Sequence, residues 1–303
     1  MTNDTAGVAT LEDASRIRWA GLTGREHGDA AAPGPTLVFL HGLTFSRRMW
    51  YPVLDALPAQ SHAIAFDLPG HGGSDPPEGP GLAPAVRALH EAILAAGLDA
   101  PVVVGHSIGG SIAALYGASH PVSGVVSVEA PMRFEPFAER MRSLAPMLIG
   151  DGFDDAWAIY RESWRLDLLA EADRALLDEL PSQELVLGYQ ADILDGPLDA
   201  IVSRRDEGLG RLRAAGTPFI SLYTAEVDPL ERSFLAARLP QAEIAVWPVG
   251  HHFPHLSDPD RFVRLLAGAR REAASRRFRS TTARRPRASN RVRRRAGARR
   301  PGG

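Results

Sequence analysis

The chain contains no cysteine and no lysine, and it has no apolar run as long as the ~18–20 residues that a membrane-spanning helix needs. The absence of cysteine excludes disulfides, thiolate metal sites and a cysteine nucleophile. The absence of lysine excludes a P-loop, whose lysine contacts the phosphates. The first residues, "MTNDTAGVATLEDASRIRW", are acidic and lack an apolar centre, so we expect no signal peptide. These absences lead us to expect a soluble, cytoplasmic protein without contact to a membrane.

The formal net charge of −2 combines an acidic body with a basic tail. Twelve of the 34 basic residues lie at 276–303, which leaves the rest of the chain with 22 basic and 36 acidic side chains. The tail has no apolar periodicity, and we expect residues 272–303 to be disordered. Such a tail could contact nucleic acid only through its charge, without reading the bases. We expect its deletion to leave the activity of the body intact.

Short β-rich runs alternate with helix-like segments along most of the chain. The expected strands are "TLVFLHG" (36–42), the beginning of "HAIAFDLPGHGGSD" (62–75), "PVVVGHS" (101–107), 122–131, 218–228 and 242–250, and the expected helices include 86–98 and the closing "DPDRFVRLLAGARREA" (258–273). This alternation predicts an α/β protein with a mainly parallel central sheet flanked by crossover helices.

One long segment interrupts this alternation, because it holds several helical patterns and no convincing strand. A helical insertion between two late strands predicts a cap or lid over the sheet. The expected domains are a core of residues 1–131 and 216–271, a helical cap of 132–215 and the tail of 272–303. Four aromatic side chains of the cap fall at helical spacing on one face: Phe153, Trp157, Tyr160 and Trp164. That face forms the cap's own core or its seat on the body, or else, through Trp157 and Trp164, the wall of an apolar substrate pocket.

The stretch "VVVGHSIGGS", residues 102–111, places Ser107 among glycines where a buried strand ends and a helix begins. It fits the pattern G-x-S-x-G in the strand–turn–helix context that this motif requires. Strand and helix pass so close in such a turn that only glycines fit beside the serine. The turn exposes the serine oxygen and puts the N–H of Ile108 at a helix N-terminus, where it can stabilise negative charge. We therefore predict that Ser107 is a nucleophile.

With a serine in this turn, the chain resembles capped serine hydrolases of the α/β-hydrolase fold, roughly over residues 17–270. His41-Gly42 at a strand end is similar to the family's oxyanion segment, which implies that Leu43 supplies a second backbone N–H beside that of Ile108. "DLPGHGGSD" resembles the loop that usually borders the site entrance. The resemblance implies an enzyme without a cofactor that acts on a small, largely apolar acyl substrate.

A serine hydroxyl is a poor nucleophile and needs a general base. Most of the ten histidines lie in other turns, strands or helices. The cluster "GHHFPHLSDPDRF" follows the last strand, where the family keeps its base, and the family's spacing from histidine to proline selects His252. His251 and His255 are the alternatives. These histidines with Asp258 also have the composition of a zinc site, but the hydrolase pattern explains them better.

The base in turn needs an acid that orients it. Asp228 in "YTAEVDPL" follows a strand and precedes a proline that can start a helix, and the chain order Ser107, Asp228, His252 is that of the hydrolases. The ordinary role of an aspartate in this place is a helix N-cap. Two other acids compete with it: Glu226, two residues away, and Glu129, which ends the strand "GVVSVEAP", where some relatives place their acid.

These residues together predict acyl transfer. His252 removes the proton of Ser107 as the serine attacks an acyl carbonyl, and the oxyanion is held by the N–H groups of Leu43 and Ile108. Dehalogenases and epoxide hydrolases of this fold use an aspartate at the elbow, so the serine argues against both. Ester hydrolysis is the first prediction. A thioesterase, a lactonase or a C–C bond hydrolase would use the same triad, and a non-catalytic ligand-binding protein on this fold is the alternative of another class.

Overall fold

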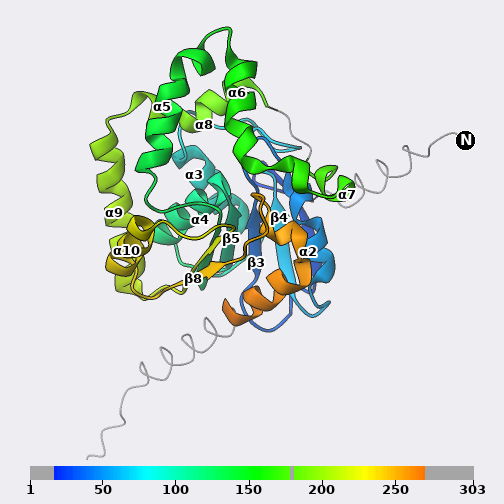
Figure 1. Ribbon diagram of the computed structural model, residues 1–303. Helices are drawn as coiled ribbons and strands as arrows, with labels where there is room; N and C mark the ends of the chain where they lie inside the picture. The colour runs from blue at the N-terminus through cyan, green and yellow to red at the C-terminus, as the bar shows by residue number, and fades with distance from the viewer. Residues whose placement is uncertain (1–16, 178–180, 270–303) are drawn as a thin grey trace, which may run out of the picture.

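The computed structural model describes residues 17–177 and 181–269, which form helices around one central sheet (Figure 1). The eight strands are β1 (Ile17–Trp19), β2 (Leu22–Gly28), β3 (Leu37–Leu40), β4 (His62–Phe66), β5 (Val102–His106), β6 (Gly124–Val128), β7 (Phe219–Tyr223) and β8 (Ala242–Val246). Their order in the sheet is β1-β2-β4-β3-β5-β6-β7-β8. The pairs β1–β2 and β2–β4 are antiparallel, and the other pairs are parallel. The predicted α/β fold with a mainly parallel sheet is confirmed.

The central strands are continuous apolar runs because helices cover both faces of the sheet. All residues of β3 to β7 are buried, among them the three valines that begin β5. The strands β1 and β2 had no counterpart among the expected strands. In β2, "LTGREHG", charged and partly exposed residues follow the buried first three, and the apolar signal is lost. The predictions for the N-terminus and the arginine-rich tail lie outside the described residues.

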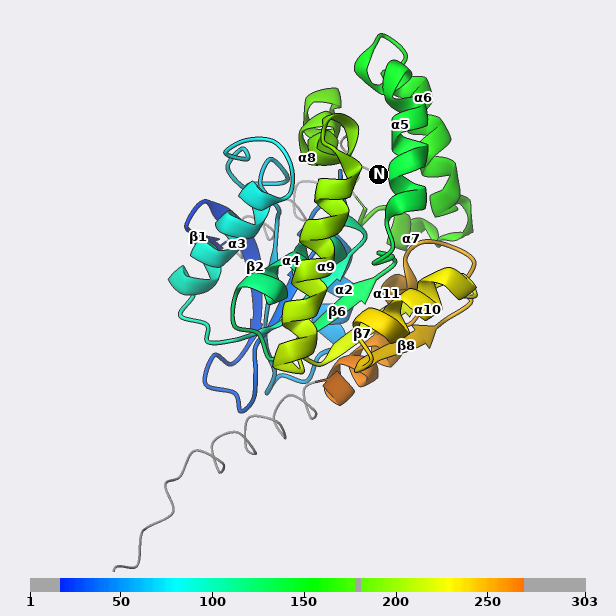
Figure 2. The ribbon, with the colours of Figure 1, turned by 90° about the vertical axis from the view of Figure 1, so that its left-hand side faces the viewer.

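Helices cover both faces of this sheet (Figure 2). One side carries α3 (Ala83–Ala95), α4 (Ile108–Ser119), α9 (Leu198–Ala215) and α10 (Pro229–Arg238), and the other carries α2 (Tyr51–Ala56), α11 (Pro254–Ser257) and a helix from 259 that is described to 269. The predicted closing helix corresponds to the last of these elements, as far as it is described, whereas α11 was not predicted. None of the helices in the described ranges is long and apolar enough to cross a membrane.

Between β6 and β7 the described residues form helices joined by turns and loops, with no strand among them, so the predicted insertion between two late strands is confirmed. It comprises α5 (Glu135–Ile149), α6 (Phe153–Arg161), η2 (Glu162–Trp164), η3 (Leu166–Leu168), α7 (Glu171–Arg174), α8 (Gln183–Asp195) and α9. The helices α5, α6 and α8 stand above the carboxyl ends of the parallel strands (Figures 1 and 2). The last helix returns to the body, where Arg211 of α9 donates a hydrogen bond of 2.8 Å to the carbonyl of Ala118 at the end of α4.

Candidate active site

Ser107 lies in the turn between β5 and α4, with φ 53° and ψ −122°. This conformation costs a residue other than glycine about 1–3 kcal/mol. The glycines around it are required because a side chain at these positions would clash with the backbone. A Cβ on Gly105 would overlap the carbonyl oxygen of Gly109, and a Cβ on Gly109 would lie 2.6 Å from the carbonyl oxygens of Leu40 and His41. The first turn of α4 therefore touches the ends of β5 and β3, and the serine stands where these elements meet.

Glu129 occupies the corresponding place at the end of the neighbouring strand, β6. The N–H of Ser107 donates to the carbonyl of Val128 at 2.8 Å, which holds the two strand ends together. Glu129 also has a positive φ, 54°, and its N–H donates to the carbonyl of Leu222 on β7 at 2.8 Å. One carboxylate oxygen, Oε1, accepts the N–H of Thr224 at 2.6 Å. The other oxygen remains for a side-chain partner.

That partner is His252, in the loop after β8. Its Nδ1 lies 3.0 Å from Oε2 of Glu129, and the two side chains are only 15% and 16% exposed. A carboxylate can only accept, so Nδ1 carries the proton and donates it, which leaves the lone pair on Nε2. This Nε2 is buried and has no hydrogen-bond partner among the described residues. In this tautomer the ring can accept a proton from a hydroxyl group.

His252 is next to the elbow, although no hydrogen bond joins it to the hydroxyl of Ser107 within the described part of the chain. The ring of His106 lies 4.6 Å from the ring of His252, centroid to centroid. Because His106 immediately precedes Ser107, Ser107 and His252 are neighbours in space. Bonds between a nucleophile and its base are often long in ligand-free sites and tighten when substrate binds.

Asp228, the acid expected from the sequence, does not contact His252. Its side chain accepts the N–H of Leu230 at 2.8 Å and caps α10, and it is 56% exposed, with Arg133 4.0 Å away. The helix begins at Pro229, directly after Asp228, so the nearest groups for the carboxylate are the free N–H groups of the helix start. The structure thus differs from the sequence-based expectation for Asp228, because the carboxylate that contacts His252 is that of Glu129. The other alternative, Glu226, is exposed.

The two predicted oxyanion donors, Leu43 and Ile108, lie on the two elements that meet at Gly109. Ile108 is the first residue of α4, so its N–H has no acceptor one turn earlier in the helix. Leu43 is buried in the loop that leaves β3. Both N–H groups thus belong to the segments that the close approach at Gly109 brings together, and their role remains a prediction.

Two buried histidines hold the loop that contains Leu43. His41 donates from Nδ1 to the carbonyl of Gly42 at 2.7 Å and accepts the N–H of Leu68 on Nε2 at 2.9 Å. His71 accepts the N–H of Thr44 on Nε2 at 3.0 Å. Burial lowers the pKa of His41 to about 4 and that of His71 to about 3. Both rings are therefore neutral acceptors at neutral pH, which is what these hydrogen bonds require.

Trp164 brings the cap into contact with His252. Its carbonyl accepts the N–H of His252 at 3.0 Å, and the two rings are parallel within 7°, with centroids 6.2 Å apart. Phe45 lies 5.1 Å from the same indole ring. Trp157 packs against the edge of Trp164 at 5.5 Å, farther into the cap. Both tryptophans are buried, so this helix face seats the cap on the body, and Trp164 also borders the candidate site.

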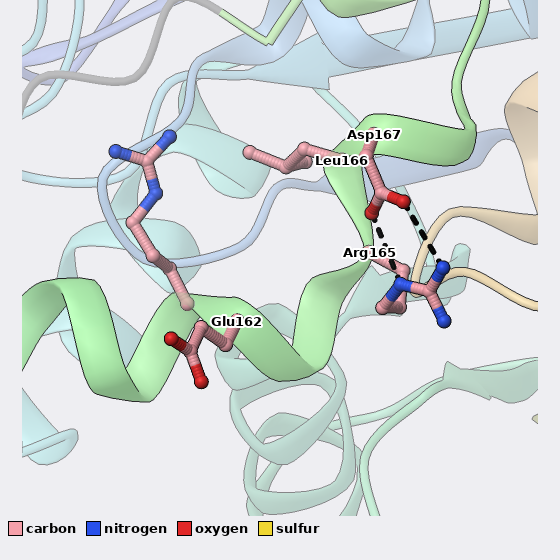
Figure 3. Close-up of a pocket in the computed structure, with 5 residues that line it drawn as sticks. Glu162, Arg165, Leu166 and Asp167 are labelled. Atoms are coloured by element: carbon pink, nitrogen blue, oxygen red, sulfur yellow. Dashed lines mark hydrogen bonds and ion pairs between the residues drawn. The ribbon is translucent and has the colours of Figure 1, made fainter.

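A groove of about 510 Å³ lies on the cap, at residues on either side of Trp164 in the chain. It is lined by Arg161, Glu162, Arg165, Leu166 and Asp167 (Figure 3). The guanidinium of Arg165 donates two hydrogen bonds of 3.0 Å to the carboxylate of Asp167, and this pair is exposed. The groove contains none of the reactive side chains described above, so we do not regard it as the reaction centre.

His251 and His255, the other two histidines of the segment after β8, make contacts away from Glu129. His251 accepts the N–H of Phe253 at 3.1 Å and lies 2.8 Å from the hydroxyl of Ser257. His255 is fully buried, with its ring 4.3 Å from that of Trp50. Neither contacts Glu129. Within residues 17–177 and 181–269, no group of three or more histidine, aspartate or glutamate side chains could hold a metal ion.

Glu231, which no sequence pattern indicated, braces the segment that follows Glu129. Its carboxylate is buried and accepts the N–H groups of Met132 and Arg133 at 2.8 and 2.9 Å. The hydroxyl of Tyr223 donates to the same carboxylate at 2.8 Å. A glutamate in the first turn of a helix is ordinarily a favourable surface residue, so the sequence carried no signal of this role.

Comparison with known proteins supports the fold. Residues 37–265 match the family model described as "Alpha/beta hydrolase family". The chain is 25% identical over 259 residues to "Putative carbamate hydrolase RutD" of Shigella flexneri serotype 5b (strain 8401), across 78% of this chain and 91% of that protein.

Two solved structures show the same fold. Haloalkane dehalogenase DbeA from Bradyrhizobium elkani USDA94 has a TM-score of 0.66 and 21% identity, over 86% of this chain and 98% of that one. The enol-lactonase from Burkholderia xenovorans LB400 has a TM-score of 0.65 and 17% identity, over 84% and 98%. The match to the family model spans most of the sequence, and the chain therefore belongs to the Alpha/beta hydrolase family.

Proposed function

We propose that the protein is a serine hydrolase that cleaves an ester-type acyl bond of a small, largely apolar substrate. In this proposal Ser107 is the nucleophile, His252 the general base and Glu129 the orienting acid. The observation that carries it is the 3.0 Å hydrogen bond between Glu129 and Nδ1 of His252, beside the strained turn of Ser107. A carboxylate on Nδ1 selects the tautomer whose Nε2 can take the serine proton.

The reaction then proceeds in two halves. Nε2 of His252 takes the proton of Ser107 as Oγ attacks the acyl carbonyl, and Glu129 stabilises the imidazolium that forms. The N–H groups of Leu43 and Ile108 hold the oxyanion, and each such donor typically contributes about 2.7–4 kcal/mol. The intermediate collapses, and the leaving alcohol takes the proton from His252. Water, deprotonated by the same nitrogen, attacks the acyl-enzyme, and the acid leaves as Oγ of Ser107 takes the proton back from His252.

The surroundings of the base favour an apolar acyl group. Trp164, Phe45 and Phe253 are all buried and pack around His252 or one another, with ring centroids 5.1 to 6.2 Å apart. Trp157 lies behind Trp164 and shapes this wall from within the cap. An apolar wall with few polar groups is typical of sites that bind small organic ligands.

Carbamates and lactones are further acyl compounds that the same triad would attack. The curated relative is named for carbamate hydrolysis and one structural neighbour for an enol-lactone. Both compounds present a carbonyl bonded to a leaving group, so the attack by serine is chemically the same as on an ester. We therefore include a carbamate and a lactone among the substrates to be tested.

The test is hydrolysis of p-nitrophenyl esters of rising acyl length, with an aryl carbamate and a lactone beside them. Wild type should turn over at least one of them, and Ser107→Ala should lose at least a thousandfold in kcat. The matched control is Ser119→Ala, which changes an exposed serine on the same helix. A fluorophosphonate should label wild type and this control but not Ser107→Ala. Turnover that survives in Ser107→Ala would refute the proposal. A folded wild type that no fluorophosphonate labels and no substrate engages would favour the ligand-binding alternative.

A further inference from the structure

The main chain of His252 is held from two opposite parts of the molecule. On the cap side, its N–H donates to the carbonyl of Trp164 at 3.0 Å. On the body side, its carbonyl lies 2.8 Å from Nε2 of His106, which is 146 positions earlier in the chain. These two bonds tie the backbone of the histidine to the cap on one side and to the residue before Ser107 on the other.

The second of these bonds determines the protonation of His106. A carbonyl oxygen can only accept, so Nε2 of His106 must carry the proton and donate it. The ring is completely buried, and burial lowers the pKa of His106 well below its ordinary value, which keeps it neutral. Its Nδ1 is buried with no hydrogen-bond partner among the described residues. The bond to His252 is therefore the one polar contact of this side chain within those residues.

Packing leaves this imidazole little freedom to turn away. The ring of Phe253 is stacked on it at 5.1 Å, with 26° between the planes. On the side of the oxyanion loop, a Cβ at Gly42 would lie 2.9 Å from Nδ1, so the backbone there comes close to the ring. The donor is thus aimed at one acceptor by packing on both sides.

We propose that His106 is a positioning residue for the base: it ties the backbone of His252 to the peptide that carries Ser107. The inference rests on the proposed function, because it assigns His252 as the base. Since His106 and Ser107 are consecutive, this one hydrogen bond links the backbone of the base directly to the residue beside the nucleophile. Without that bond, the hydrogen bonds of the His252 main chain would be reduced to the one with Trp164, on the cap. A misplacement of about 1 Å costs on the order of a hundredfold in rate.

The decisive comparison is His106→Met against His106→Gln. Methionine and glutamine have nearly the same length and shape, but only glutamine has an N–H group that can reach the carbonyl of His252. We expect kcat for the best ester to fall about a hundredfold in His106→Met, with KM unchanged, and glutamine to recover most of the loss. His255→Phe is the control, because it removes a second fully buried imidazole that has no hydrogen bond. It should keep the activity of wild type.

A second readout does not depend on turnover. The proton between Nδ1 of His252 and Glu129 should give a low-field NMR signal in wild type and His106→Gln, which broadens or shifts in His106→Met. If wild type neither hydrolyses esters nor reacts with a fluorophosphonate, the proposed function fails, and this signal still tests the positioning. Should His106→Met fail to fold, His106→Phe removes the donor and keeps a ring against Phe253. A folded donor-free variant with the kcat and NMR signal of wild type would overturn the inference. Equal losses in His106→Met, His106→Gln and His255→Phe would overturn it too, because they would indicate general damage to the core.

Discussion

Replacing Glu129 by glutamine should remove most of the catalytic activity by reversing the tautomer of the base. Glutamate offers acceptors to two donors, the N–H of Thr224 at 2.6 Å and Nδ1 of His252 at 3.0 Å. Glutamine has the same shape but one acceptor oxygen and one NH₂ group. The shorter bond retains the oxygen, so the NH₂ group faces Nδ1. The imidazole then accepts at Nδ1 and carries its proton on Nε2, where the lone pair for Ser107 should be.

The magnitude follows from the loss of the correct tautomer. In a serine protease triad, the corresponding amide replacement lowers kcat about 10⁴-fold with the geometry intact. We expect a loss of about 10³- to 10⁴-fold here, which corresponds to about 4–5 kcal/mol in the activation free energy. Because the replacement is isosteric, the melting temperature should change far less than the activity.

Asp228→Asn is the matched control for this prediction. Asparagine caps helices as well as aspartate does, and the exposed carboxylate gives up only its 4.0 Å contact with Arg133. Its kcat should stay that of wild type. The assay is steady-state hydrolysis of the best p-nitrophenyl ester, with thermal unfolding measured on the same samples. If Asp228→Asn loses as much activity as Glu129→Gln, or if Glu129→Gln is fully active, the assignment of Glu129 is wrong.

Three further predictions concern the architecture of the site. Ser107→Gly should be more stable than Ser107→Ala by about 1–2 kcal/mol, because glycine adopts φ 53° without strain; equal melting temperatures for these two inactive variants would contradict it. Gly109→Ala should strongly destabilise the fold, since the new Cβ would lie 2.6 Å from two backbone oxygens. Gly210→Ala, whose new Cβ would have nothing within 4 Å, should stabilise α9 by up to about 1 kcal/mol. Thermal unfolding of both variants measures the difference. Lowering the pH should destabilise the fold because His41 and His71 take up protons below pH 6.5 when unfolded but only near pH 4 and 3 when folded. Their stabilising contribution is complete above pH 6.5 and is lost as the pH falls. At about 1.4 kcal/mol per pH unit, His41 alone loses about 2–3 kcal/mol by pH 4.5. Urea titrations at pH 7 and 4.5 that give the same unfolding free energy would refute this.

Most of the fold could be predicted because its signals are local. Buried parallel strands read as continuous apolar runs such as that of β5, and the long helical insertion has a helical period throughout. The first two strands could not be found in this way. β2 carries charged residues over its second half because that part of the strand is only partly covered, so its pattern resembles that of a loop.

The candidate site likewise contains some features with a local signal in the sequence and others without one. The elbow is encoded by the spacing of Gly105, Ser107 and Gly109, because a turn this tight admits no other residues at its flanks. His252 follows from its place after the last strand in a family that keeps its base there. Neither the buried brace at Glu231 nor the bond from His106 to His252 has a sequence pattern, since each joins segments about a hundred or more positions apart.

By itself, the sequence determined the alternation of strands and helices and the sharp turn at Ser107, and it predicted His252 as the candidate base, because these depend on residues close together in the chain. Only the tertiary structure decided which carboxylate contacts His252. Glu129 and Asp228 both follow parallel strands and so lie at the same edge of the sheet. The helix that begins at Pro229 provides N–H groups for Asp228, whereas the positive φ of Glu129 and the N–H of Thr224 direct its carboxylate to His252. That choice depends on backbone direction and on the nearest free donors, and the chain acquires both only when it is folded.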